Sequence, residues 1–367
     1  MKGNRLVISA FSLSLSLVFY ACDNKSQKTV PQSEFSEKSD TIKNEYAKGF
    51  RMISTNNGMK VDILDPTSQA IIHTYLIGKG DGTNVYSNDI TNVVALSVTH
   101  VGMMRKLELA DKITGVSNLK FLCRPLNEQQ VMSVGDLETS NPELIMSAHP
   151  DIIFYSGFNL ESPTLKKLDQ AGLRTFLIYD WKEIHPLGRA EWLKVFGVLF
   201  KKEKEANDLF YDIRTRYQKI KNKLANTDKK PTVLAGTYWG EFFNAPKGES
   251  YQAQLLRDAN VNYVYGNTEG SGSLSLSLES VVTDNLETDF WVNAAAATMG
   301  ELHKQSQKFE IMAAVRSRNI YTYLESGNCY WENAPIEPDV VLEDLGKIFY
   351  PEKFKDKEFT YYAKIKK

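Results

Sequence analysis

Two stretches of the chain share one pattern of polar and apolar positions. The first covers residues 141–157 and the second covers residues 277–293. Each begins with a polar residue suited to cap a helix, and Glu143 or Glu279 follows in the first helical turn. Each then has an aspartate, Asp151 or Asp289, directly before three apolar residues. The pattern predicts a short capped helix that leads into a buried strand in both places.

The same alternation of strand and helix extends on both sides of these stretches. Apolar strands are expected at residues 92–97, 112–117, 151–157 and 174–180, and again at 232–237, 261–266 and 319–324. Segments with helical spacing lie between them, and strands that alternate with helices indicate a parallel sheet covered on both faces. We therefore predict an α/β fold with two Rossmann-like lobes that have parallel sheets, at residues 91–188 and 228–355.

The remaining segments of the chain complete this plan. Apolar residues recur at intervals of three and four across residues 189–227, which predicts a long linking helix, with a kink at Gly197. Two alternating stretches flank Asn56-Asn57-Gly58, a hairpin signal, so a small antiparallel β appendage is expected at residues 48–90. Residues 356–367 are expected to form a tail.

The first residues of the chain have the features of an export signal. A short basic segment is followed by an apolar run that is too short to span a membrane, and Ala21 then precedes Cys22. We interpret residues 1–21 as a lipoprotein signal peptide and Cys22 as the lipidated residue that anchors the protein at the cell envelope. The alternative is ordinary secretion, in which Cys22 has no role. The polar residues 22–47 are expected to form a disordered tether.

Composition narrows the range of functions. Lys and Arg total 44 and Asp and Glu total 45, a balance that argues against a nucleic-acid partner. Cys123 and Cys329 lie far apart and show no metal-ligand spacing, so either a disulfide in an oxidising compartment or two separate thiols fits the sequence. None of the five histidines pairs at zinc-motif spacing, and no metal site is predicted.

The order of these segments resembles the iron-complex and cobalamin group of periplasmic substrate-binding proteins, the partners of ABC importers. Residues 93–117, 134–157 and 271–293 carry the resemblance, and the leader and the long middle helix agree with it. The resemblance implies a monomer with a ligand cleft between its lobes and no resident cofactor. It also implies that Glu143 and Glu279 dock the two lobes on the permease dimer. As an alternative, both glutamates are simple helix-start residues, which the helix dipole favours.

Candidate cleft residues follow from the rule that ligands bind outside the carboxyl ends of parallel strands. Polar and aromatic residues stand at those ends and suit a flat, partly apolar ligand. Arg124, in the loop that also carries Lys120, is expected to meet an anionic group. The predicted cleft residues are Thr99, His100, Arg124, Tyr155, Phe158, Trp181, Tyr238, Trp239, Tyr330 and Trp331.

The sequence thus predicts a lipid-anchored protein of the periplasmic face that captures a small-molecule metal complex. The expected cargo is a ferric siderophore or haem, with cobalamin as the alternative. A binder of bare Zn²⁺ or Mn²⁺ ions remains as a rival, because His100 and His185 both follow predicted strands and Glu183 lies nearby. An enzyme is the least favoured class, because the chain lacks the Gly-x-Ser-x-Gly, His-Glu-x-x-His and phosphate-loop patterns, and no catalytic residue is predicted.

Overall fold

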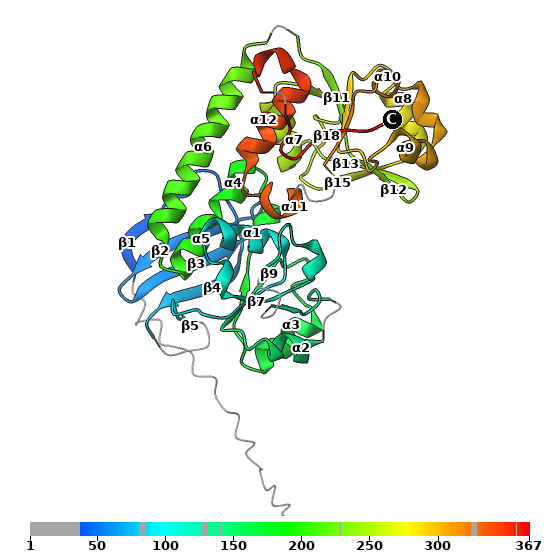
Figure 1. Ribbon diagram of the computed structural model, residues 1–367. Coiled ribbons are helices and arrows are strands. Elements are labelled where there is room, and N and C mark those ends of the chain that lie inside the picture. Colours follow the sequence, from blue (N-terminus) through cyan, green and yellow to red (C-terminus); the bar gives the residue numbers. More distant parts are fainter. Residues whose placement is uncertain are drawn as a thin grey trace, which may run out of the picture.

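A computed structural model shows two α/β lobes with a long helix, α6 (Glu203–Ala225), along one side of both (Figure 1). The predicted fold class is thereby confirmed. The signal peptide 1–21 and Cys22 lie outside the described residues, which are 37–80, 85–126, 131–138, 141–227, 229–323, 329–356 and 358–367.

The N-terminal lobe is built on five parallel strands in the order β10-β9-β6-β7-β8. The central strands are buried and strongly apolar, as expected for a parallel sheet with helices on its faces. The strands are β6 (Val93–Ala95), β7 (Ile113–Val116), β8 (Met132–Ser133), β9 (Ile152–Tyr155) and β10 (Thr175–Leu177). The helices are α1 (Val98–Lys106), η2 (Ala110–Lys112), η3 (Leu119–Phe121), α2 (Pro142–Ser147), α3 (Pro163–Gln170) and η4 (Asp180–Lys182).

The C-terminal lobe repeats this plan with the strand order β14-β11-β16-β17-β18 and adds a three-stranded antiparallel sheet, β12-β13-β15. The strands are β11 (Thr232–Ala235), β12 (Thr237–Trp239), β13 (Phe242–Pro246), β14 (Asn262–Tyr263), β15 (Ser273–Leu276), β16 (Phe290–Val292), β17 (Ile320–Thr322) and β18 (Ala363–Lys364). The helices are α7 (Tyr251–Asp258), α8 (Leu278–Asp284), α9 (Met299–Gln305), η5 (Gln307–Ile311), α10 (Ala313–Arg316), α11 (Tyr330–Asn333), α12 (Pro338–Phe349) and η6 (Pro351–Lys353).

Asp151 and Asp289, the aspartates of the repeated pattern, form equivalent hydrogen bonds in the two lobes. The Asp151 carboxylate accepts hydrogen bonds from the backbone N–H groups of Thr91 and Asn92, at 2.8 and 2.9 Å. The Asp289 carboxylate accepts bonds from the backbone N–H and the hydroxyl of Thr232, at 2.8 and 2.9 Å. Each aspartate therefore ties the start of its own strand to the start of the neighbouring strand, β6 or β11.

The region between the lobes differs from the predicted helix over 189–227. It consists of three helices, α4 (Pro186–Glu191), α5 (Leu193–Leu199) and α6, and the chain turns between α5 and α6 at Lys201, which has φ 56°. Gly197 makes no kink. It lies inside α5, where a Cβ atom would stand 2.7 Å from the Cβ of Ala206 on α6. Glycine therefore lets the two helices pack closely, which a reading of helix propensity alone does not anticipate.

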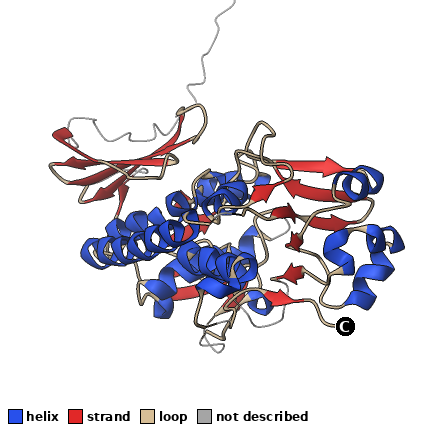
Figure 2. Cartoon of the chain, turned by 90° about the horizontal axis from the view of Figure 1, so that it is seen from above, coloured by secondary structure: helices blue, strands red, loops and turns tan. Residues whose placement is uncertain are grey.

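The N-terminal sheet is larger than the appendage predicted at residues 48–90. Its strands β1 (Glu37–Ile42), β2 (Phe50–Thr55), β3 (Gly58–Leu64), β4 (Ile71–Gly78) and β5 (Val85–Tyr86) lie at one side of the molecule (Figure 2). The hairpin at Asn56-Asn57-Gly58 is confirmed, since β2 and β3 pair across it. Two details of the prediction were wrong. The tether predicted at 22–47 contains strand β1, and the appendage predicted as antiparallel includes a parallel pair, β4 and β5.

Two buried carboxylates fasten the segment between β1 and β2 to the lobe. Glu191 accepts the backbone N–H groups of residues 45, 46 and 47 at 2.8–2.9 Å. Glu183 accepts those of residues 48 and 49 at 2.8–3.1 Å, together with the indole N–H of Trp192 at 3.0 Å. Five consecutive amides thus point at two side chains from the region around α4, which explains why the sheet is an integral part of the molecule.

The last residues also belong to the C-terminal lobe, so the prediction of a separate tail at 356–367 was wrong. Strand β18 pairs antiparallel with β17. The buried carboxylate of Asp344 on α12 accepts the backbone N–H groups of Thr360, Tyr361 and Tyr362, at 2.7–3.2 Å. The sequence gives only a weak signal for this pairing, because β18 is two residues long.

Candidate functional site

A cavity of about 930 Å³ lies between the two lobes, and we call it the cleft. The N-terminal lobe contributes residues that follow β6, β7, β9 and β10, as the rule for carboxyl ends of parallel strands requires. The C-terminal lobe contributes the start of α7 and the region around α11. The lining includes Thr99, Lys120, Phe158, Asp180, Trp181, Arg189, Tyr251, Tyr323, Tyr330 and Trp331.

Aromatic side chains form both walls of the cleft. On the N-terminal lobe, the rings of Phe158 and Trp181 are 4.8 Å apart, and the Trp181 indole N–H donates to the carbonyl of Ser156 at 2.7 Å. On the C-terminal lobe, Tyr323 and Tyr330 stack at 4.1 Å with an angle of 9°. Phe158 is 75% exposed, so this wall offers ring surface to a ligand.

Trp331 extends the C-terminal wall toward solvent. The Trp331 ring packs edge-on against the rings of Tyr323 and Tyr330, with ring centres 5.3 and 5.4 Å apart. Trp331 is 56% exposed. Burial raises the pKa of Tyr323 to about 12, and it raises the pKa of Tyr330 well above its ordinary value. Both hydroxyl groups therefore stay protonated at neutral pH, and the wall carries no negative charge from tyrosinate.

A buried arginine stands at the base of the cleft. The Arg189 guanidinium on α4 bonds through Nη2 and Nε to one carboxylate oxygen of Asp180, at 2.8 and 3.3 Å. It also lies 4.7 Å from the centre of the Tyr251 ring. Burial alone would lower the pKa of Arg189, but Asp180 raises it above its ordinary value. The cleft therefore presents a positioned cation that is held in place by an acid and an aromatic face.

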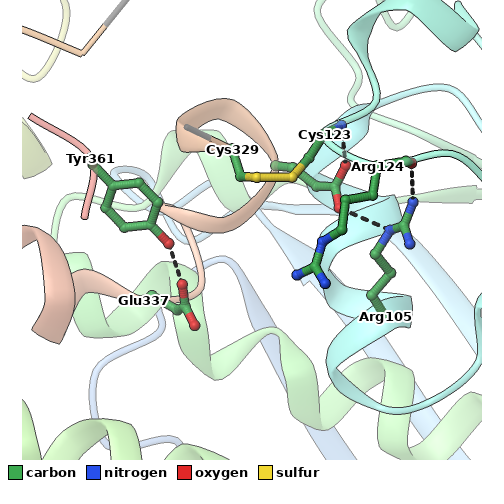
Figure 3. The surroundings of a disulfide bond; sticks show 7 residues. Arg105, Cys123, Arg124, Cys329, Glu337 and Tyr361 are labelled. Atoms are coloured by element: carbon green, nitrogen blue, oxygen red, sulfur yellow. Dashed lines mark hydrogen bonds and ion pairs between the residues drawn. A yellow bond between two sulfur atoms is a disulfide. The ribbon is translucent and has the colours of Figure 1, made fainter. Parts of the chain in front are cut away.

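A disulfide between Cys123 and Cys329 crosses from one lobe to the other, and both cysteines line the cleft (Figure 3). Glu332 on α11 adds further bonds between the lobes. Its carboxylate accepts a hydrogen bond from the backbone N–H of Cys123 at 3.0 Å and forms an ion pair with Arg105 on α1 at 2.9 Å. Helices α1 and α11 can approach because Gly102 has no side chain: a Cβ there would lie 2.1 Å from the Glu332 carbonyl oxygen. One edge of the cleft is thus closed covalently.

Half of the predicted cleft residues line this cavity and half do not. Thr99, Phe158, Trp181, Tyr330 and Trp331 line it. His100 and Tyr155 lie instead in the core of the N-terminal lobe, where His100 is 0% exposed and burial lowers its pKa to about 4. Both follow or end a predicted strand, but each side chain points to the inner side of its element.

Arg124, Tyr238 and Trp239 also lie outside the cleft lining. The Arg124 side chain is exposed beside the disulfide, and its carbonyl accepts a bond from Arg105 at 2.5 Å (Figure 3). The neighbouring Lys120 lines the cleft in its place. Tyr238 and Trp239 lie on β12, which leaves the parallel sheet and pairs with β13, so the expected strand end is the start of a hairpin.

Sequence reasoning missed Arg189, Tyr251 and Tyr323. Tyr323 follows β17, so the rule that identified the other strand ends could have found it. Arg189 was included in the predicted linking helix, where an arginine is an ordinary solvent-facing residue. Only the folded structure shows that Arg189 on α4 borders the cleft. It also shows that Asp180, nine residues before Arg189 in the sequence, is the ion-pair partner of Arg189.

The two glutamates predicted to dock on a permease are exposed, one on each lobe. Glu143 lies in the first turn of α2, after the cap Asn141, and Glu279 lies in the first turn of α8, after the cap Ser277. Glu279 forms an ion pair with Lys308 at 2.5 Å, and the side-chain hydrogen bond from Lys308 lowers its pKa. Neither glutamate lines the cleft.

The rival metal-ion site does not assemble from its proposed residues. His185 caps α4, where its Nδ1 accepts the backbone N–H of Leu187 at 3.1 Å, and Glu183 holds residues 48 and 49. Within the described ranges, no group of three or more His, Cys, Asp or Glu side chains is placed to hold a metal ion. In the same ranges, no helix has the length and apolar character needed to cross a membrane.

The fold and the cleft define the class: a two-lobed binding protein whose ligand site lies between its lobes. A family model described as periplasmic binding protein matches residues 93–326, and the chain belongs to that family. The family and fold are those of substrate-binding proteins, which take up small-molecule ligands and work with ABC transporters.

Relatives of known sequence and structure agree with this assignment. An uncharacterized lipoprotein of Methanocaldococcus jannaschii is 26% identical over 301 residues, which cover 78% of this chain and 71% of that protein. A periplasmic heme binding protein from Pseudomonas aeruginosa superposes with a TM-score of 0.62 at 18% identity, over 76% of this chain and 99% of its own. A petrobactin-binding protein from Bacillus subtilis gives 0.57 at 16% identity, over 79% and 99%. At these identities the structural likeness concerns the fold.

Proposed function

We propose that this protein captures an iron complex, a ferric siderophore or haem, in the cleft and delivers it to an ABC importer. One observation carries the proposal: the cleft combines aromatic walls on both lobes with Lys120 and with Arg189, whose partner Asp180 also lines the cleft. Aromatic faces suit the flat ligands of a metal complex, and the cations suit its carboxylate or catecholate groups. Solved proteins with this fold that bind haem or petrobactin support the choice of cargo class.

Delivery rests on the exposed glutamates of the two lobes. Glu143 and Glu279 lie at helix starts on separate lobes and away from the cleft, so they can meet a second protein while a ligand is bound. Carboxylates in such positions guide encounter and fix register with arginines of a partner. Lipidation of Cys22 would keep the protein beside its importer, and the lipoprotein name of its relative from Methanocaldococcus jannaschii supports that anchor.

Tryptophan fluorescence tests the proposed cargo. Trp181 and Trp331 line the cleft, so a bound coloured complex will quench them. We expect saturable quenching with haem, with ferric catecholate or hydroxamate complexes, or with cyanocobalamin, and the class that quenches identifies the cargo. Saturable binding of Zn²⁺ or Mn²⁺ salts with none of these complexes would favour the metal-ion rival and contradict the proposal.

A variant separates the cleft from other binding surfaces. The double variant Arg189→Met/Asp180→Asn removes the positioned cation together with the charge of its buried partner, and it keeps side chains of similar size. We expect it to weaken binding of an anionic complex by about 10-fold or more, since hydrogen bonds to charged groups contribute about 1.5–3 kcal/mol. Arg318→Met, on an exposed turn after α10 and outside the cleft lining, is the matched control and should leave affinity unchanged.

A further inference from the structure

A second cavity of about 480 Å³ opens beside the cleft, and we call it the side chamber. Trp181, Tyr251 and Tyr323 line both cavities, so the two cavities adjoin each other at these three side chains. The side chamber also lies between the lobes, because Trp181 comes from the N-terminal lobe and β12 and β13 come from the C-terminal lobe. The space between the lobes therefore extends beyond the cleft.

The antiparallel sheet β12-β13-β15 forms the C-terminal wall of the side chamber. Alternate residues of a strand point to opposite faces. Phe243 and Ala245 are buried in the lobe, whereas Asn244 and Ser273 point the other way and line the chamber. The sheet lies on the side of the C-terminal lobe that faces the N-terminal lobe (Figure 1).

The same face continues outward to two exposed aromatic residues. Thr237 pairs with Asn244, and two residues further along the hairpin Trp239 pairs with Phe242. By the period of two, Trp239 and Phe242 share the face of Thr237 and Asn244. Trp239 is 77% exposed. The face thus has polar side chains at its base and an aromatic pair at its tip.

The chemistry of the side chamber differs from that of the cleft. Its C-terminal wall consists of neutral hydroxyl and amide groups, and the Asn244 and Ser271 side chains form no hydrogen bond with any described residue. Two charged residues border the chamber. Glu183 is buried and already accepts three N–H groups, and the Lys182 ammonium lies 4.9 Å from the Trp181 ring centre. Apart from the Lys182 ammonium at its border, the chamber therefore offers neutral groups, which suit an uncharged partner that both donates and accepts hydrogen bonds.

We propose that the side chamber binds an uncharged, amide- or hydroxyl-bearing arm of the cargo, while the cleft holds its metal-binding head. This inference rests on the proposed function and narrows the cargo class. The ligand is a metal complex whose scaffold extends beyond the coordinating groups. Asn244 recognises that scaffold, and Trp239 and Phe242 cover it from the C-terminal lobe. Haem, which has no neutral polar arm, does not fill the chamber.

Matched pairs of ferric complexes test the proposal. Ferrioxamine E, which is uncharged, carries amides outside its iron-binding hydroxamates, and ferric tris(acetohydroxamate), also uncharged, has the same type of iron coordination without a scaffold. Ferric enterobactin and ferric tris(catecholate) form a second pair. In the wild-type protein, the complex with a scaffold should bind at least 10-fold more tightly than its partner in whichever pair binds.

Variants of side-chamber residues then show where the difference in affinity between the two complexes of a pair arises. Asn244→Leu should weaken the complex with a scaffold about 3- to 10-fold, the loss expected for one or two hydrogen bonds, and change its partner less than 2-fold. Trp239→Ala should act in the same direction. Asn207→Leu, at an exposed position of α6, is the control and should change neither. Circular dichroism confirms that each variant is folded.

The outcomes separate this inference from the proposed function. A protein that binds no metal complex contradicts the proposed function itself. A protein that binds haem alone, or binds both members of a pair equally, retains the proposed function and overturns the side-chamber assignment. Equal losses for both members in Asn244→Leu would also overturn it, because a general effect on the cleft would then explain the result.

Discussion

The disulfide between Cys123 and Cys329 should contribute strongly to stability, because it closes a very long loop. The two residues are 206 positions apart, and the bond joins the two lobes at the edge of the cleft. In the chain-entropy model, a cross-link restricts the unfolded chain by an amount that grows with the logarithm of loop length. For this separation the model gives about 5 kcal/mol at 25 °C, near the upper end of the usual range.

The variant that measures this contribution is Cys123→Ser/Cys329→Ser. Serine keeps the size of each side chain, so little packing is lost apart from the bond itself. Guanidinium unfolding followed by circular dichroism should show a decrease of about 3–5 kcal/mol in the free energy of unfolding. The same decrease is expected for the wild-type protein in the presence of a reductant, and the reductant should have no effect on the double variant.

Single variants serve as the control. Either substitution breaks the bond, so Cys123→Ser and Cys329→Ser, measured in reductant, should each be as much less stable than the oxidised wild-type protein as the double variant is. Losses that simply add would show that two independent side chains matter and not a shared bond. A double variant within about 1 kcal/mol of the oxidised wild-type protein would refute the reasoning, since the loop would then contribute nothing measurable.

Three further predictions concern the anchor, the partner and pH. Cys22→Ser should abolish labelling with palmitate and release the protein from membranes, and a labelled variant would contradict the lipoprotein interpretation. Glu143→Ala and Glu279→Ala should lower uptake without altering ligand affinity. The effect should shrink at high salt, because charges are screened over about 10 Å at 0.1 M. Normal uptake in the double variant would exclude docking through these glutamates. Burial raises the pKa of Glu183 to about 7, so its contribution to stability is complete below its unfolded value of 4.5 and is lost as pH rises through 7. Relative to Glu183→Gln, the wild-type protein should lose up to about 3 kcal/mol of unfolding free energy between pH 5 and 8, and parallel pH profiles would contradict this.

Much of the fold could be predicted because the signals are local and strong. Buried strands such as residues 152–155 read as continuous apolar runs, and caps such as Asn141 and Ser277 mark helix starts. The aspartates Asp151 and Asp289 even revealed the repeat, and the structure gives both the same bonds. The elements that escaped prediction are those with weak local signals, such as the two-residue strand β18.

The candidate site was less predictable, because it depends on which way side chains point. The strand-end rule placed Phe158 and Trp181 in the cleft, where loops after parallel strands must lie. It failed for His100 because the residue begins a helix whose inner face packs on the sheet. It failed for Trp239 because the chain turns into a hairpin, and the side chain joins the face of the side chamber instead.

The cargo that the protein carries from the cell tests the account most directly. Native mass spectrometry of the protein, purified without added ligand from iron-limited cells, should show a second species heavier by the mass of one small molecule. Its fragment should have the isotope pattern of iron, and the Arg189→Met/Asp180→Asn variant should show a smaller fraction of the loaded species. A co-purified ligand without a metal, or a loaded fraction that is unchanged in the Arg189→Met/Asp180→Asn variant, would contradict the capture of an iron complex in the cleft.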